Sequence, residues 1–236
     1  MFLTKKTMEN TLGVAEMAIT TAMNDEEVKT PLLEYNYDES RLQEGLDLHK
    51  IAKQKYQQQV KEKGEKLQAR ENIEKTYNEA NPVYIEHITL TRMALKKRPA
   101  MKDKFSLRGS RRRDIFGWIE QAELFYKNVL EDEEALNLLS YYDLTKEKLQ
   151  KGQELVLKVK TAVQTQQKEK SESQDATEKR DQAFNALSDW ISDFFQVCKF
   201  ALNTKPQVLE RLGILALSEG YKRRRGITPE EEIVEG

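Results

Sequence analysis

The sequence predicts an all-α fold: a tandem duplication of a three-helix unit, with one short and two long antiparallel helices in each copy, arranged as a pseudo-twofold helical bundle. One observation behind this prediction is the composition. Of the 236 residues, 38% are hydrophobic and 33% are charged, with only 10 glycines and 5 prolines. Average globular domains are about 45–50% apolar. Few helix breakers and many charged residues are typical of long helices with solvated outer faces.

The second observation is an internal repeat with a period of 107 residues. Residues 12–107 align with residues 119–214 without a gap, and 24 of the 96 aligned pairs are identical, which is 25%. A fixed period of this kind indicates a duplicated structural unit. We therefore divide the chain into an N-terminal segment (1–11), helical repeat 1 (12–107), a basic linker (108–118), helical repeat 2 (119–214) and a tail that is first basic and then acidic (215–236).

The individual helices follow from apolar residues that recur three and four positions apart. The short helix of each repeat is predicted from Leu12, Ala15, Ile19 and Ala22, and from Ile119, Ala122, Tyr126 and Val129. The first long helix has a coiled-coil-like seam at Leu42, Gly45, His49, Ala52 and Tyr56, matched by Leu149, Gly152, Val156, Val159 and Val163. The return helix has Ile73, Tyr77, Ala80, Tyr84, His87 and Thr91, and its counterpart has Phe184, Leu187, Ile191, Phe194 and Cys198. No segment alternates apolar and polar residues as a half-buried strand does.

Two polar stretches suggest where the long helices turn back. No apolar residue lies between Val60 and Leu67, where Gly64 stands, and the serine-containing run 171–175 occupies a similar gap in repeat 2. We expect both stretches to be exposed hairpin tips, with one continuous helix of about 60 residues per repeat as the alternative. The helices should end before Pro99 and Pro206, because proline disfavours helical backbone in the residue before it.

The net charge, the cysteine count and the lengths of the apolar stretches limit the classes of function. The 39 basic and 40 acidic residues give a net charge of -1, which provides no global field for nucleic acid or an anionic membrane. A single cysteine, Cys198, allows no internal disulfide. No stretch approaches the roughly 18 apolar residues that a membrane span needs, and no signal peptide is recognisable. We expect a soluble, cytoplasmic protein.

The histidines and a pair of glutamates are the residues best suited to catalysis or metal binding, and for both a structural role is the favoured interpretation. His49 and His87 align with Val156 and Phe194, which favours partly buried structural histidines over metal ligands. Glu16 and its counterpart Glu123 could share a proton or a metal ion, but a carboxylate that pairs with a nearby lysine or arginine is the favoured interpretation.

The cysteine and a pair of glycines have packing interpretations. Cys198 aligns with Thr91 and is interpreted as a small core thiol. Glycine at both Gly45 and Gly152, inside helices, suggests a close helix crossing or a kink. With no phosphate-binding loop, nucleophile elbow or dinucleotide motif in the sequence, we predict no catalytic residue, no metal site and no cofactor.

Two basic clusters are the strongest local anomaly. Each follows a glycine just beyond the end of a repeat. The clusters are Arg111, Arg112 and Arg113 in the linker, and Lys222, Arg223, Arg224 and Arg225 in the tail. They are solvated linker charges or a pair of positive patches for phosphates or an acidic partner.

We therefore expect a non-enzymatic helical-bundle interaction or scaffold protein that binds a protein partner or self-associates through its amphipathic helices. One alternative is the binding of an anionic ligand or nucleic acid through the paired arginine clusters. A second alternative is a bundle enzyme or cofactor carrier with a site between the repeats.

Overall fold

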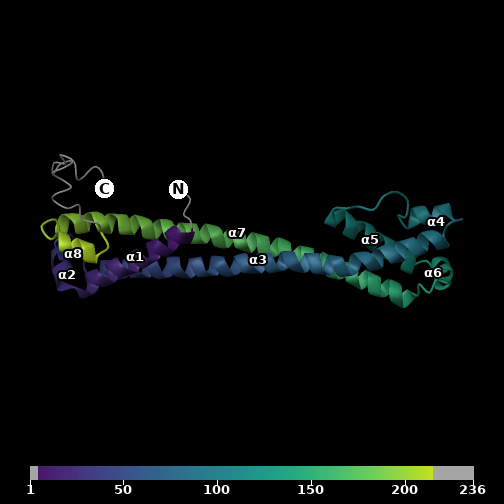
Figure 1. Ribbon diagram of the computed structural model, residues 1–236, viewed down its shortest axis with the longest axis horizontal. Coiled ribbons are helices and arrows are strands. Elements are labelled where there is room, and N and C mark those ends of the chain that lie inside the picture. The colour runs from purple at the N-terminus through teal and green to yellow at the C-terminus, as the bar shows by residue number, and fades with distance from the viewer. Residues whose placement is uncertain (1–4, 215–236) are drawn as a thin grey trace. The chain divides into compact units, whose positions relative to one another are not determined.

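A computed structural model describes residues 5–214 of the chain. Within this range the prediction of an all-helical fold is confirmed: there are eight α-helices and no β-strand (Figure 1). The helices are α1 (Lys5–Asn24), α2 (Glu26–Leu33), α3 (Glu39–Ala94), α4 (Pro99–Lys104), α5 (Ile115–Leu130), α6 (Glu133–Ser140), α7 (Lys146–Ala201) and α8 (Pro206–Arg211). None of these helices is long and apolar enough to cross a membrane.

Three helices of the second half match three of the first in length and position. The bounds of α2, α3 and α4, shifted by 107 residues, are the bounds of α6, α7 and α8. The two long helices, α3 and α7, have 56 residues each. The same sequence spacing therefore places the same local structure twice.

The turns that lead into α3 and α7 are also alike. Asn36 and Asp143 adopt left-handed backbone conformations, with φ of 60° and 57°, which Asn and Asp tolerate better than most residues. Two residues later, the side chains of Asp38 and Thr145 accept the backbone N–H three positions on, at 2.9 and 3.4 Å. Both side chains thus cap the first turn of a long helix, as short polar side chains commonly do.

The chain forms two compact units that differ from the two repeats. Within the described range, unit 1 contains residues 5–59 and 176–214, and unit 2 contains residues 60–175. The boundaries fall inside α3 and α7, so each long helix contributes one part to each unit. Each unit therefore combines elements of both repeats.

Unit 1 is built from α1, α2, the first part of α3, the last part of α7 and α8 (Figure 1). Ring contacts join Tyr37 to Phe194 at 5.4 Å and Tyr56 to Phe184 at 6.2 Å. Residue numbers rise on one side of this interface while they fall on the other, so the two long helices are antiparallel here. Phe184 and Phe194 of repeat 2 thus pack against repeat 1.

Unit 2 is built from the rest of α3, α4, α5, α6 and the first part of α7. Its core is aromatic: the ring of Tyr84 lies 5.6 Å from Trp118, 5.8 Å from Phe125 and 6.1 Å from Tyr126. Edge-on and tilted ring pairs at these separations are favourable beyond the area they bury.

The predicted hairpin tips are wrong, because α3 and α7 are each continuous through them. Gly64 lies inside α3, and residues 171–175 lie inside α7. A single glycine in a helix costs only about 1 kcal/mol relative to alanine, and the run 171–175 contains neither glycine nor proline. Gly64 and four residues of the run are exposed, whereas Ser173 is buried, at 7% exposure. Each repeat has one long helix of 56 residues, as in the alternative of one continuous helix, where we had favoured two.

Candidate functional site

The arginine cluster of the linker precedes α5 directly. Arg111, Arg112 and Arg113 are exposed, and the backbone N–H of Arg112 donates to Oε1 of Gln121 at 3.1 Å. Asp114 then caps α5 by accepting the N–H of Gly117 at 2.7 Å. The cluster is therefore held beside the first turns of α5. The second predicted cluster, Lys222–Arg225, lies outside the described residues, so the pairing of the two clusters stays a prediction.

Arg113 borders a groove on unit 2, which we call the basic groove. The groove has a volume of about 630 Å³. Its lining residues come from α3 of repeat 1, from the linker at the start of α5, and from α7 of repeat 2. The lining residues are Lys66, Leu67, Arg70, Ile73, Glu74 and Tyr77 of α3, Arg113 and Ile115 at the start of α5, and Gln166 and Lys170 of α7.

The floor of the basic groove is apolar and fixed to the core of unit 2. Tyr77 packs edge-on against Trp118 with ring centroids 5.0 Å apart. The Trp118 indole N–H donates to Oδ1 of Asn81 at 3.1 Å, which fixes that ring in turn. Leu67, by contrast, is 55% exposed on the rim. The groove therefore offers a firm apolar base and an accessible apolar edge.

The four cations of the basic groove are unpaired within residues 5–214: no carboxylate lies within ion-pair distance of Lys66, Arg70, Arg113 or Lys170. Their neighbours along the same helices do pair, since Lys61 reaches Glu65 and Lys168 reaches Glu172, each at 3.4 Å. Glu74 is the acidic residue among the lining side chains. The groove thus presents a net positive, partly apolar surface. Of its cations, sequence analysis identified Arg113 alone.

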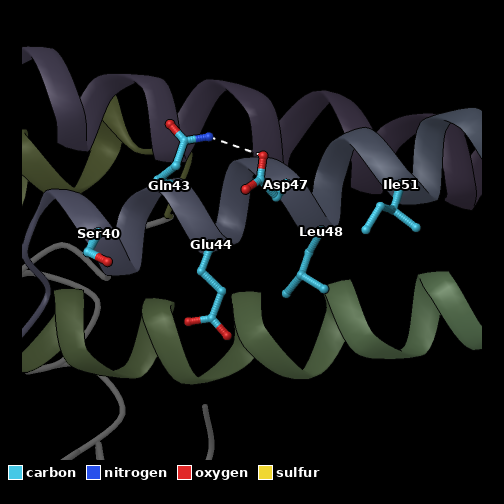
Figure 2. A pocket seen from close by; sticks show the side chains of 6 residues that line it. All are labelled: Ser40, Gln43, Glu44, Asp47, Leu48 and Ile51. Carbon is cyan, nitrogen blue, oxygen red and sulfur yellow. Dashed lines mark hydrogen bonds between the residues drawn. The ribbon is translucent and has the colours of Figure 1, made fainter.

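A second groove lies on unit 1, and its charged lining residues are acidic. Figure 2 shows that its six lining residues all come from α3, where Gln43 and Asp47 project on one side of the helix and Glu44 and Leu48 on the other. The amide of Gln43 donates to Oδ1 of Asp47 at 3.1 Å. Because a single helix supplies every lining residue, side chains of different helices do not converge in this acidic groove.

Three carboxylates converge in unit 2, where Glu62, Glu65 and Glu169 place oxygen atoms within 4.8 Å of one another. Carboxylate oxygens suit Mg²⁺ and Ca²⁺. All three side chains are only partly buried, however, and Glu65 already lies beside Lys61. Exposed acidic groups of this kind are common without an ion, so the cluster carries no assignment. Sequence analysis missed it, although Glu62 and Glu169 align under the 107-residue shift.

Both histidines are buried, as predicted, at 5% exposure each. In unit 2, Nδ1 of His87 lies 3.0 Å from the Tyr126 hydroxyl. In unit 1, Nε2 of His49 has no hydrogen-bond partner and lies 3.8 Å from a Glu16 carboxylate oxygen. Burial lowers the pKa of both rings, and Glu16 partly offsets this effect on the pKa of His49. Among residues 5–214, neither ring belongs to a group of carboxylate or histidine side chains close enough to hold a metal ion.

The paired glutamates form the predicted contacts with lysine. The Nζ of Lys160 donates to both carboxylate oxygens of Glu123, at 2.7 and 3.0 Å. The equivalent pair in unit 1, Lys53 and Glu16, is 3.8 Å apart. Glu16 belongs to unit 1 and Glu123 to unit 2, and each has its own cationic partner.

Cys198 is fully buried in the core of unit 1, and burial raises its pKa to about 12. A thiol with such a pKa is protonated at neutral pH and is a poor nucleophile. The interpretation as a core thiol is therefore confirmed.

Compared with known proteins, the chain matches no family model, no curated protein and no solved structure.

Proposed function

We propose that the protein is a non-enzymatic interaction protein that binds a protein partner through the helical surface of unit 2. The basic groove is the observation that carries this proposal. Surfaces on which exposed apolar side chains are rimmed by polar or charged ones are typical of interaction sites. Leu67, at 55% exposure beside unpaired cations, has these properties.

The side chains best suited to catalysis support a non-enzymatic role, because each is buried in a core or paired with a neighbouring side chain. His87 contacts the Tyr126 hydroxyl, Glu123 pairs with Lys160, and Cys198 is buried. These observations favour a binding function over the alternative of a bundle enzyme or cofactor carrier. The proposal includes the case in which the partner is a second copy of the chain. It also includes a cytoplasmic location, with which a single free cysteine is compatible.

Anionic-ligand or nucleic-acid binding is the other candidate, and the exposed Arg111–Arg113 cluster favours it. It predicts salt-sensitive binding of an oligonucleotide that disappears when both arginine clusters are changed to serine. Sequence-tolerant binding of single strands usually relies on aromatic stacking platforms. In the basic groove the aromatic side chain, Tyr77, instead packs on Trp118. We therefore rank this function second.

We further propose that the two repeats arose by duplication of one ancestral unit and keep a pseudo-twofold relation. The identical lengths and the constant 107-residue offset of three helix pairs support this proposal. The offset also covers contacts: Lys53 with Glu16 and Lys160 with Glu123 are equivalent pairs.

Affinity capture with matched variants tests the proposed function. The immobilised full chain, its Leu67→Glu variant and its Leu157→Glu variant are each exposed to lysate of the source cells. Leu157 is 56% exposed on α7 and does not line the basic groove, so its replacement controls for added charge. We expect a protein that the unaltered chain and Leu157→Glu retain and that Leu67→Glu loses. Equal retention by all three, or none above bare resin, would refute the proposal.

A further inference from the structure

We infer that the basic groove binds a short acidic segment of a partner protein that also carries apolar side chains. This inference rests on the proposed function and specifies the chemistry of the partner.

The charge of the groove points to an acidic segment. Lys66 and Arg70 on α3, Arg113 before α5 and Lys170 on α7 surround one opening. None of them has a carboxylate partner within residues 5–214, so their positive charge is available to an incoming anion. Complementary charges across an interface speed association and select the partner. A segment with several Asp or Glu residues is the matching protein ligand.

The apolar lining adds a second requirement. Leu67, Ile73, Tyr77 and Ile115 supply hydrocarbon surface between the cations. A purely polar polyanion would leave this surface wet, whereas Leu, Ile or Phe side chains of a peptide would cover it. The ligand is therefore amphipathic, with acidic residues beside the cations and apolar residues over the apolar lining.

The groove also sets the length of the ligand. Leu67 and Tyr77 are ten residues apart along α3, a distance of about 15 Å at the helical rise of 1.5 Å per residue. About three turns of helix, or about five extended residues, would span it. A peptide of about 12 residues is thus long enough to cover the groove in either conformation.

A random 12-residue peptide library displayed on phage tests the chemistry while the partner is still unidentified. The library is selected in parallel on the full chain and on its Lys170→Glu variant. We expect the unaltered chain to enrich peptides that combine acidic with apolar residues. A selected peptide, made synthetically, should bind Lys170→Glu at least tenfold more weakly, which is the effect of reversing about one charge contact. Enrichment of basic or uncharged peptides would overturn the inference.

Lys158→Glu provides the matched control, because Lys158 is exposed on α7 within unit 2 and does not line the groove. It changes the net charge of the chain by the same amount, so the peptide should bind it within about twofold of the unaltered chain. Equal weakening by both variants would show a general charge effect and refute a specific site. Displacement of the peptide by a 20-nucleotide single strand at low concentration would assign the groove to nucleic acid instead.

The two proposals fail in different ways. A partner that is lost from Leu67→Glu but retained by Lys170→Glu would leave the proposed function intact and overturn the acidic-segment inference. The reverse result is also distinguishable. If no partner is captured but acidic peptides bind the unaltered chain and not Lys170→Glu, the proposed function is refuted and the inferred chemistry of the groove stands.

Discussion

The closest packing at the scale of single residues occurs at two glycines inside the long helices. A Cβ atom added at Gly45 would lie 2.4–2.7 Å from ring atoms of Trp190, and one added at Gly152 would lie 2.3 Å from the Tyr126 hydroxyl. The sequence analysis predicted a close helix crossing or a kink at both positions, and the structure places a side chain of another helix against each glycine. The approaching group is an aromatic side chain, however, and its identity could not be predicted because it depends on tertiary packing.

Gly45→Ala should therefore destabilise the protein, although alanine favours helices. The added methyl meets the Trp190 ring, which Tyr37 and Phe194 also contact, so the ring cannot move freely. We expect a loss of about 1–3 kcal/mol in the free energy of unfolding, as for other overpacked sites. Urea denaturation provides the measurement.

Gly64→Ala is the matched control, because Gly64 also lies inside α3 but has no atom within 4 Å of the added Cβ. That variant should gain about 0.5–1 kcal/mol from helix propensity. A gain of the same size at Gly45 would contradict the described packing.

His49 should make the protein less stable in mild acid. Its pKa in the folded chain lies below the ordinary 6.5, because burial disfavours the charged ring. Between the lowered pKa and 6.5 the unfolded chain binds more protons than the folded chain, so the free energy of unfolding falls as the pH drops below 6.5.

His49→Leu removes this titration and the unpartnered Nε2 atom. The variant should lose less stability than the unaltered chain between pH 7 and about pH 5, while His87 contributes equally to both. Chemical denaturation at each pH gives the comparison. Parallel decline of the two proteins would show that His49 does not have a lowered pKa.

At the scale of elements, the prolines after the long helices predicted helix ends correctly, whereas the stretches without apolar residues did not. The prolines at 99 and 206 do follow the ends of α3 and α7, as predicted. The gaps were misread because a missing apolar residue marks exposure, and an exposed helix looks the same as an exposed turn in this pattern. A proline does not settle the matter by itself either, because α3 continues through Pro82.

Proline at Ser171 tests the continuity of α7. Inside a helix, Ser171→Pro removes a backbone hydrogen bond and clashes with the preceding turn, at a cost of about 3 kcal/mol or more. Ser171→Ala, the control, should be neutral or slightly stabilising. Thermal and urea unfolding would reveal the difference. Similar stability of the two variants would fit an exposed hairpin tip at this position and would contradict a continuous α7.

At the scale of the whole molecule, the important property is that each compact unit draws on both repeats. Asp25 caps α2 in unit 1 and accepts Arg211 of α8 at 2.9 Å, while Asp132 caps α6 in unit 2 and accepts Lys104 of α4 at 2.7 Å. The two ion pairs are equivalent under the 107-residue shift, and in each the partners come from different repeats. The repeats therefore exchange their terminal helices.

This exchange explains why sequence analysis found only a part of the candidate site. Arg113 belongs to a visible run of arginines, whereas Lys66, Arg70 and Lys170 are ordinary helix-surface charges in two different repeats. They share one groove because α3 of repeat 1 and α7 of repeat 2 both contribute to unit 2. The same partition into units underlies the proposed function.

Zero-length carbodiimide cross-linking of Arg211→Lys, followed by mass spectrometry of the monomer, tests this shared construction most directly. The variant introduces an amine where the guanidinium contacts Asp25 and Glu27, each at 2.9 Å, and mirrors Lys104 at the equivalent position. We expect cross-links from position 211 to Asp25 or Glu27 within one chain, together with the native Lys104–Asp132 link. Cross-links from position 211 confined to carboxylates of residues 119–214, or found only between differently isotope-labelled chains, would contradict the account.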